Sequence, residues 1–75
     1  MKQLPETIKM LRQKSLLTQA DFAAELNVAV STVNRWEKGK AVPHITAMKA
    51  IKEFCKEHEY PYEEIESCWL NQGKE

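Results

Sequence analysis

The sequence predicts an all-α fold, and three observations lead to this prediction. Apolar residues recur at intervals of three and four, the spacing that places them on one face of a helix. No segment alternates apolar and polar residues with period two, as a half-buried strand would. Proline, glycine and asparagine separate the apolar segments, where they end one helix or begin the next. We therefore expect five short helices joined by turns.

Length and composition restrict the class of protein. The chain has 75 residues, 43% hydrophobic and 29% charged, as in a globular domain. A chain of this size buries only roughly 60% of the surface that its unfolded form exposes, which leaves no room for a deep catalytic cleft. We interpret residues 1–75 as a single domain with a core over about residues 4–58. We find no Ser/His/Asp, metal-binding or phosphate-loop arrangement, so we do not expect an enzyme or a cofactor.

The sequence shows no membrane span and no signal peptide. Residues 22–34 are mostly uncharged, but Glu25 interrupts them, and they fall short of the ~20 apolar residues of a membrane helix. Residues 1–10 are charged and contain no apolar segment of the signal-peptide type. We expect a cytoplasmic protein.

The first helix is predicted over about residues 5–14. Pro5 suits the first helical position, and Glu6 favours the positive end of the helix dipole. The core side of this helix is one apolar stripe, formed by Leu4, Ile8 and Leu11.

A second helix is predicted over about residues 19–26. Thr18 is a good N-cap, and Asp21 follows three residues later as an acidic variant of the capping box. Asn27 follows the last apolar residue and tolerates the left-handed conformation in which helices commonly end. A sharp turn is therefore expected there. The buried side chains of this helix are Phe22, Ala23 and Leu26.

The third helix, over about residues 30–38, has two contrasting faces. Val33 and Trp36 point to the core, and Gly39 closes the helix. Glu37 points toward the edge of the core. The opposite face bears only hydrogen-bonding or cationic groups, namely Ser31, Asn34, Arg35 and Lys38, with Val30 at its margin. A merely solvated face usually includes glutamates, so this face is a candidate binding surface.

Two further helices complete the predicted fold. The fourth, over about residues 45–57, buries the stripe Ile45, Met48, Ile51, Phe54 and Cys55. Pro61 suits the first position of the fifth, which covers about residues 62–71 and precedes a frayed tail at 72–75. One face of the fifth helix carries Tyr62, Ile65, Cys68 and Trp69. This face either packs on the bundle or meets a second copy of the chain, with Tyr62, Ile65 and Trp69 as candidate dimer contacts.

The charge is unevenly distributed, although the net charge is zero. Residues 1–49 contain eight lysines and arginines against four acids, and residues 50–75 contain three against seven. The basic part, residues 1–49, would be attracted to phosphate, and the acidic part, residues 50–75, would be repelled from it.

The two cysteines are interpreted as reduced, partly buried thiols. Small secreted domains usually carry more cysteines. A metal site is the weaker alternative; it would combine Cys55 and His58, one helical turn apart, with Cys68 and His44.

Residues 17–39 read L-T-Q-A-D-F-A-A-E-L-N-V-A-V-S-T-V-N-R-W-E-K-G, and this stretch resembles the helix-turn-helix of the lambdoid phage repressor and Cro family, also called the XRE family. The resemblance extends more loosely from the first helix to the fourth. It implies a five-helix lambda-repressor-like DNA-binding domain of bacterial or phage origin, with the helix-turn-helix formed by the second and third helices. The third helix would then lie in the DNA major groove and the second would cross the DNA backbone.

The resemblance also implies roles for single residues. The positions that read bases correspond to Val30, Ser31, Asn34 and Arg35. Phosphate contacts correspond to Thr18, Gln19, Arg12, Lys38 and Lys40. Arg12 and Glu37 correspond to a structural ion pair between the first and third helices.

The chain departs from the family pattern at several positions. Asn27 replaces a usual glycine of the turn, and Ala29 stands where Ser or Thr normally caps the third helix. An uncapped helix is less stable by about 1 kcal/mol. His44 replaces the usual Ser or Thr after Pro43. With fewer cations than is typical, one copy would bind DNA weakly, so we expect a homodimer.

The predicted function is that of a sequence-specific double-stranded-DNA-binding transcriptional regulator, a repressor, acting as a dimer on a two-fold symmetric operator. The alternative is a protein-interaction module, such as an antitoxin-like partner, that uses the acidic C-terminal half and the fifth helix.

Overall fold

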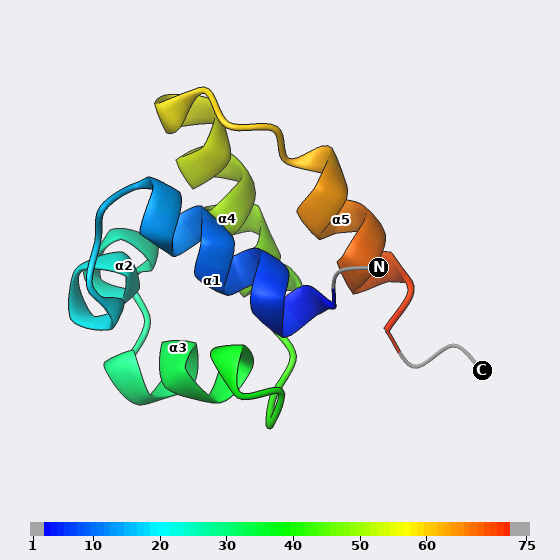
Figure 1. Ribbon diagram of the computed structural model, residues 1–75, viewed down its shortest axis with the longest axis horizontal. Coiled ribbons are helices and arrows are strands. Elements are labelled where there is room, and N and C mark those ends of the chain that lie inside the picture. Colours follow the sequence, from blue (N-terminus) through cyan, green and yellow to red (C-terminus); the bar gives the residue numbers. More distant parts are fainter. Residues whose placement is uncertain (1–2, 73–75) are drawn as a thin grey trace.

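The computed structural model describes residues 3–72, which form five α-helices and no strand (Figure 1). The helices are α1 (Leu4–Lys14), α2 (Gln19–Leu26), α3 (Val30–Glu37), α4 (Ile45–His58) and α5 (Glu63–Leu70). The all-α fold is confirmed, and each helix begins and ends within one residue of its predicted bounds. Except for Gln72, the tail predicted at 72–75 lies outside the described residues.

The core is formed mainly by the first four helices. Phe22 of α2 and Phe54 of α4 lie at its centre, with ring centroids 5.2 Å apart in an edge-to-face arrangement that aromatic pairs prefer. Ile65 extends the core to α5. The other buried apolar residues of the described part are Leu4, Ile8, Leu11, Ala23, Leu26, Val33, Trp36, Pro43, Ala47, Met48, Ile51 and Cys55.

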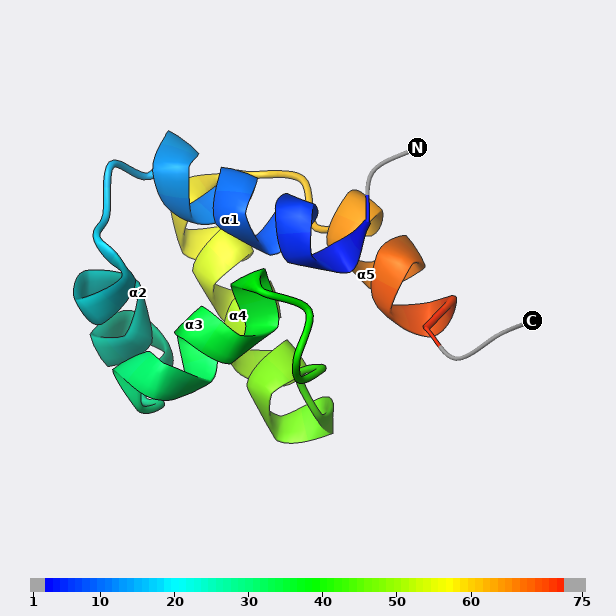
Figure 2. The same cartoon turned by 60° about the horizontal axis from the view of Figure 1, so that its bottom comes forward.

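Helix α1 connects two parts of the bundle by contacting both α3 and α5. It packs against α3 on one side and against α5 on the other, while α2 packs against α3 and α4 (Figures 1 and 2). Its buried residues recur at helical spacing, as predicted. The stripe Leu4, Ile8 and Leu11 also includes Thr7, whose hydroxyl donates to the carbonyl of Gln3 at 2.9 Å. The position of α3 is therefore set by α1 and α2 together.

The predicted core stripe of α4 is wrong at its first residue. Ile45 is 63% exposed, whereas Ala47 is buried. Ile45 is the first residue of the helix and lies beyond the end of the core, and the buried positions then follow the pattern Ala47, Met48, Ile51, Phe54 and Cys55. Pro61 likewise does not open α5, which begins two residues later at Glu63.

Helix α5 packs on its own chain. Ile65 is buried, and the side chains of Tyr62, Cys68 and Trp69 lie partly buried against the core. The indole Nε1 of Trp69 donates a hydrogen bond to the carbonyl oxygen of Pro43, in the connection between α3 and α4. The predicted face of α5 therefore covers the bundle.

Within residues 3–72, three residues other than glycine adopt the left-handed conformation. Asn27 at the end of α2 has φ 59°, as predicted. Leu16 after α1 has φ 60° and Glu59 after α4 has φ 59°. Left-handed backbone costs roughly 1–2 kcal/mol for residues with a Cβ atom, and least for Asn and Asp. Both Leu16 and Glu59 therefore carry local strain.

Candidate nucleic-acid interface

The α2–α3 unit is fixed by its caps and by a tight turn. The amide N–H of Asp21 donates to Thr18 Oγ1 at 3.0 Å, so Thr18 caps α2 as predicted. At the other end, the N–H groups of Asn27 and Val28 donate to carbonyls of the last turn of α2. Only residues 27–29 separate the two helices (Figure 2). The left-handed Asn27 is what allows this short connection to reverse direction.

Helix α3 turns a polar face away from the core. Val33 and Trp36 are buried, as predicted, and anchor the helix to the bundle. Three of the four residues expected to read bases are exposed on the other side: Val30, Ser31 and Arg35. The fourth, Asn34, is only partly buried. One helix face therefore presents an apolar group, a hydroxyl, an amide and a guanidinium.

The N-terminus of α3 has no side-chain cap. Ala29 occupies the N-cap position in extended conformation, with φ −72° and ψ 148°. The N–H groups of the first turn consequently lack a side-chain acceptor at this position. The absence of a capping Ser or Thr, expected from the sequence, therefore leaves α3 without a side-chain cap in the structure.

Arg12 and Glu37 form an ion pair between α1 and α3. Arg12 Nε donates to Glu37 Oε2 at 2.7 Å, and Arg12 Nη2 donates to Glu37 Oε1 at 3.0 Å. The side chains are 13% and 5% exposed, respectively. Arg12 Nη1 also donates to the carbonyl of Leu17, and the hydrogen bond to Glu37 raises the pKa of Arg12. Most of the guanidinium is thus turned inward, and its role as a phosphate contact stays a prediction.

Gln19 extends this pair across to the exposed face of α3. Gln19 Nε2 donates to Glu37 Oε1 at 3.0 Å, and Asn34 Nδ2 donates to Gln19 Oε1 at 3.3 Å. A continuous series of side-chain hydrogen bonds therefore runs from Arg12 through Glu37 and Gln19 to Asn34. The sequence reasoning missed this link, although Asn34 and Glu37 are three residues apart on one helix and so face the same neighbour.

The remaining residues expected to contact phosphate lie at the ends of α2 and α3. Thr18 is exposed at the start of α2. Lys38 and Lys40 are exposed in the turn after α3, where Gly39 has φ +75° and the N–H of Lys40 donates to the carbonyl of Arg35. Their contacts with phosphate stay predictions.

A surface hollow adjoins α3. It has a volume of about 400 Å³ and lies between α3 and the connection to α4. Arg35 and Thr32 line its α3 side, and Val42 and His44 line the opposite side. The hollow therefore meets the polar face of α3 at Arg35.

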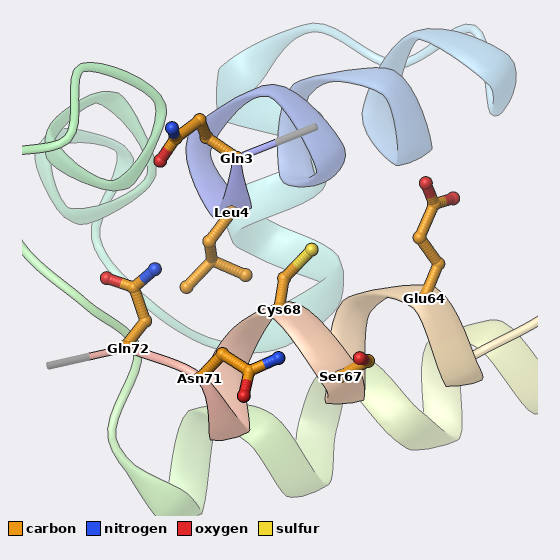
Figure 3. Close-up of a pocket in the computed structure, with 7 residues that line it drawn as sticks. All are labelled: Gln3, Leu4, Glu64, Ser67, Cys68, Asn71 and Gln72. Carbon is orange, nitrogen blue, oxygen red and sulfur yellow. The ribbon is translucent and has the colours of Figure 1, made fainter. Parts of the chain in front are cut away.

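A second hollow, of about 370 Å³, lies between the start of α1 and α5 (Figure 3). Its lining residues are Gln3, Leu4, Glu64, Ser67, Cys68, Asn71 and Gln72. None of them belongs to α2 or α3, and the thiol of Cys68 lies 3.6 Å from Thr7 Oγ1. This hollow is thus separate from the candidate interface.

The cysteines and histidines do not gather into a metal site. Cys55 and Cys68 are thiols. Within residues 3–72, no group of three or more His, Cys, Asp or Glu side chains lies close enough to hold a metal ion. Nor is any helix of that part of the chain long and apolar enough to cross a bilayer.

Comparison with known proteins identifies the family. A helix-turn-helix family matches residues 8–60, which is more than half of the chain and includes α2, α3, α4 and most of α1. The chain therefore belongs to this helix-turn-helix family, the XRE family that its sequence resembles.

One curated relative is the HTH-type transcriptional activator BcrR of Enterococcus faecalis. It is 35% identical over 49 residues, which are 65% of this chain and 24% of the relative. The likeness thus covers about a quarter of the length of that protein. No solved structure matches the chain significantly.

Proposed function

We propose that the chain is a sequence-specific double-stranded-DNA-binding regulator of transcription that inserts α3 into the major groove. The observation that carries this proposal is the exposed face of α3. Ser31 and Arg35 project from a helix whose opposite side is held by Val33 and Trp36 and whose end is held by Glu37. A protein helix of this kind fits the major groove, where base edges differ in their hydrogen-bonding groups.

Selection of bound duplexes from a random pool tests the proposal. The expected result is one enriched sequence. Arg35→Ala should weaken binding by about 1–3 kcal/mol and relax the preference at one position of that sequence, because an arginine that grips guanine specifies it. Lys49→Ala, at an exposed position of α4, is the control and should keep every preference. Unchanged binding and preferences in Arg35→Ala would remove Arg35 from base readout.

The proposed phosphate contacts are tested by salt dependence. Removing one lysine that contacts phosphate should weaken binding to all sequences alike and lower the slope of log K against log salt by about 1. Lys38→Ala and Lys40→Ala are the variants, and Lys49→Ala again serves as the control. A slope equal to that of the wild type would contradict the assignment.

We propose that two copies bind a two-fold symmetric operator, with half-sites about one helical turn, ~34 Å, apart. Among the candidate dimer contacts on α5, Ile65 is buried in the core of its own chain and cannot reach a second copy. The contact would therefore involve the exposed edges of Tyr62 and Trp69, which are only partly buried. Leu70, 57% exposed on the same helix, would add to it.

A matched pair of leucine variants tests the dimer. Leu70→Glu should reduce binding to the two-fold site far more than to a single half-site, because it places a charge in the contact between copies. Leu16→Glu introduces the same change at the other strongly exposed leucine, after α1. This variant should change binding to the two-fold site and binding to the single half-site by the same factor. Equal effects of the two variants would place the dimer contact elsewhere.

We further propose that binding lowers transcription, as the resemblance to phage repressors implies. The relative from Enterococcus faecalis bears the name of an activator, so the direction of the effect needs its own test. A reporter placed behind the selected sequence should give less product when the chain is expressed. More product would assign activation instead.

A protein-interaction role is the second candidate. It is supported by α5, which lies beyond the family match and carries Glu63, Glu64 and Glu66 in its first turn. Failure to bind DNA at low salt, together with capture of a partner that requires residues 59–75, would favour this role over DNA binding.

A further inference from the structure

The hydrogen bonds that connect Arg12 to Asn34 have only one chemically allowed direction. A guanidinium only donates, and a carboxylate only accepts. Glu37, which accepts two bonds from Arg12, must therefore also accept from Gln19. Gln19 can meet this requirement only by turning its NH₂ group toward Glu37, and its carbonyl oxygen Oε1 then points away from Glu37.

The orientation of Gln19 in turn sets that of Asn34. Asn34 Nδ2 lies 3.3 Å from Gln19 Oε1 and donates to it. The reversed amide would bring Asn34 Oδ1 against Gln19 Oε1, two acceptors with no proton between them. The buried ion pair thus determines the orientation of an amide on the face of α3, although Arg12 and Asn34 do not share a hydrogen bond.

We propose that Gln19 and Glu37 are positioning residues for base recognition, and that they make Asn34 Oδ1 the acceptor offered to DNA. The inference rests on the proposed function, in which α3 lies in the major groove. An acceptor there pairs with the exocyclic amino group of adenine or cytosine, whereas guanine and thymine present carbonyl oxygens at those places. The base facing Asn34 is therefore adenine or cytosine.

Selection from a random duplex pool with a matched pair of variants tests this inference. Gln19→Met removes the amide but keeps the length of the side chain. Gln13→Met makes the same change at an exposed position of α1 outside the hydrogen-bond series. The wild type and Gln13→Met should prefer adenine or cytosine over guanine and thymine by roughly tenfold at the position read by Asn34. Asn34→Ala identifies that position.

In Gln19→Met, the preference at that position should fall to about twofold or less, while the positions read by Arg35 keep theirs. This outcome separates positioning from the phosphate contact predicted for Gln19, because loss of a phosphate contact weakens all sequences equally. A uniform loss of affinity with unchanged preferences would overturn the inference. So would a wild-type preference for guanine or thymine opposite Asn34.

Exchange of side-chain amide protons, measured by NMR without DNA, gives a second test. In the wild type, the Nδ2 protons of Asn34 should exchange several-fold more slowly than the Nε2 protons of exposed Gln13. In Gln19→Met, the two rates should become equal. Equal rates in the wild type would overturn the inference, whatever the DNA preference. If the amides are protected but no duplex is enriched, the proposed function fails, and the role of Gln19 in base recognition fails with it.

Discussion

Arg12 and Glu37 stand 25 residues apart in the sequence, yet their side chains share two hydrogen bonds across the α1–α3 contact. The pair is nearly excluded from solvent. Removing one member of such a pair leaves an uncompensated charge, whereas removing both does not. Moving α3 away from α1 would leave both charges buried and unpaired, and this cost in free energy keeps α3 in place.

We expect Glu37→Ala to lower the free energy of unfolding by about 3 kcal/mol, because it leaves the Arg12 guanidinium unpaired. The double variant Arg12→Met, Glu37→Leu should lose less than Glu37→Ala alone. Urea denaturation of the two single variants Arg12→Met and Glu37→Leu and of the double variant measures the coupling. Simple additivity of the single losses would show that the two residues do not stabilise one another.

The uncapped start of α3 predicts a stabilising substitution. Ala29 already has the extended backbone of an N-cap residue, so Ala29→Ser supplies an acceptor without moving the chain. The free energy of unfolding should rise by about 1 kcal/mol. Thr18→Ala, which removes an existing cap, should lower it by a similar amount. Thermal denaturation measures both, and a destabilised Ala29→Ser would contradict the prediction.

The left-handed Leu16 predicts another gain in stability. Its side chain is 91% exposed, so Leu16→Gly relieves the backbone strain and loses almost no buried surface. After the entropic cost of glycine, the free energy of unfolding should rise by about 0.5 kcal/mol. Ala24→Gly, at an exposed position inside α2, is the control and should lose about 1 kcal/mol. Equal losses in both variants would rule out strain at Leu16.

The buried thiol of Cys55 predicts a loss of stability at alkaline pH. Burial, assisted by the charge of Glu63, raises the pKa of Cys55 from 9.0 to about 11. Its contribution to stability is therefore complete below pH 9 and is lost as the pH rises from 9 to 11. Burial raises the pKa of Tyr62 as well, which acts in the same direction.

Denaturation between pH 8 and pH 11 checks this contribution. Cys55→Ala should show a smaller alkaline decrease than the wild type, because the buried thiol with the raised pKa has been removed. Cys68→Ala retains Cys55 and should show the full decrease. Parallel curves for the wild type and Cys55→Ala would contradict the assignment to Cys55.

Local sequence signals were sufficient to predict the helices and the turn of the candidate interface. Thr18 and Asn27 act within one turn of their own position, so their roles as caps could be read from the sequence. Val33 and Trp36 follow helical periodicity, which a single segment reveals. The faces of α3 were therefore predictable without knowledge of the rest of the fold.

Features that depend on contacts between helices were not predictable in the same way. Ile45 has the spacing of a core residue, but the core ends before it reaches this side chain. Leu16 is left-handed because the chain must turn from α1 to α2, which overrides its intrinsic preference. The hydrogen bond of Gln19 to Glu37 depends on how α2 crosses α3, and no local pattern specifies that angle.

The two tryptophans can report whether α3 and α5 unfold together, because each lies on a helix that α1 contacts. Trp36 belongs to α3 and Trp69 to α5, and α1 contacts both of these helices. Trp69→Phe leaves Trp36 as the fluorescent tryptophan, and Trp36→Phe leaves Trp69. If α1, α3 and α5 unfold together, the fluorescence of each variant should change in parallel with its loss of helical circular dichroism. A signal from Trp69 that changes before the helical content falls would instead reveal α5 as a separately unfolding unit.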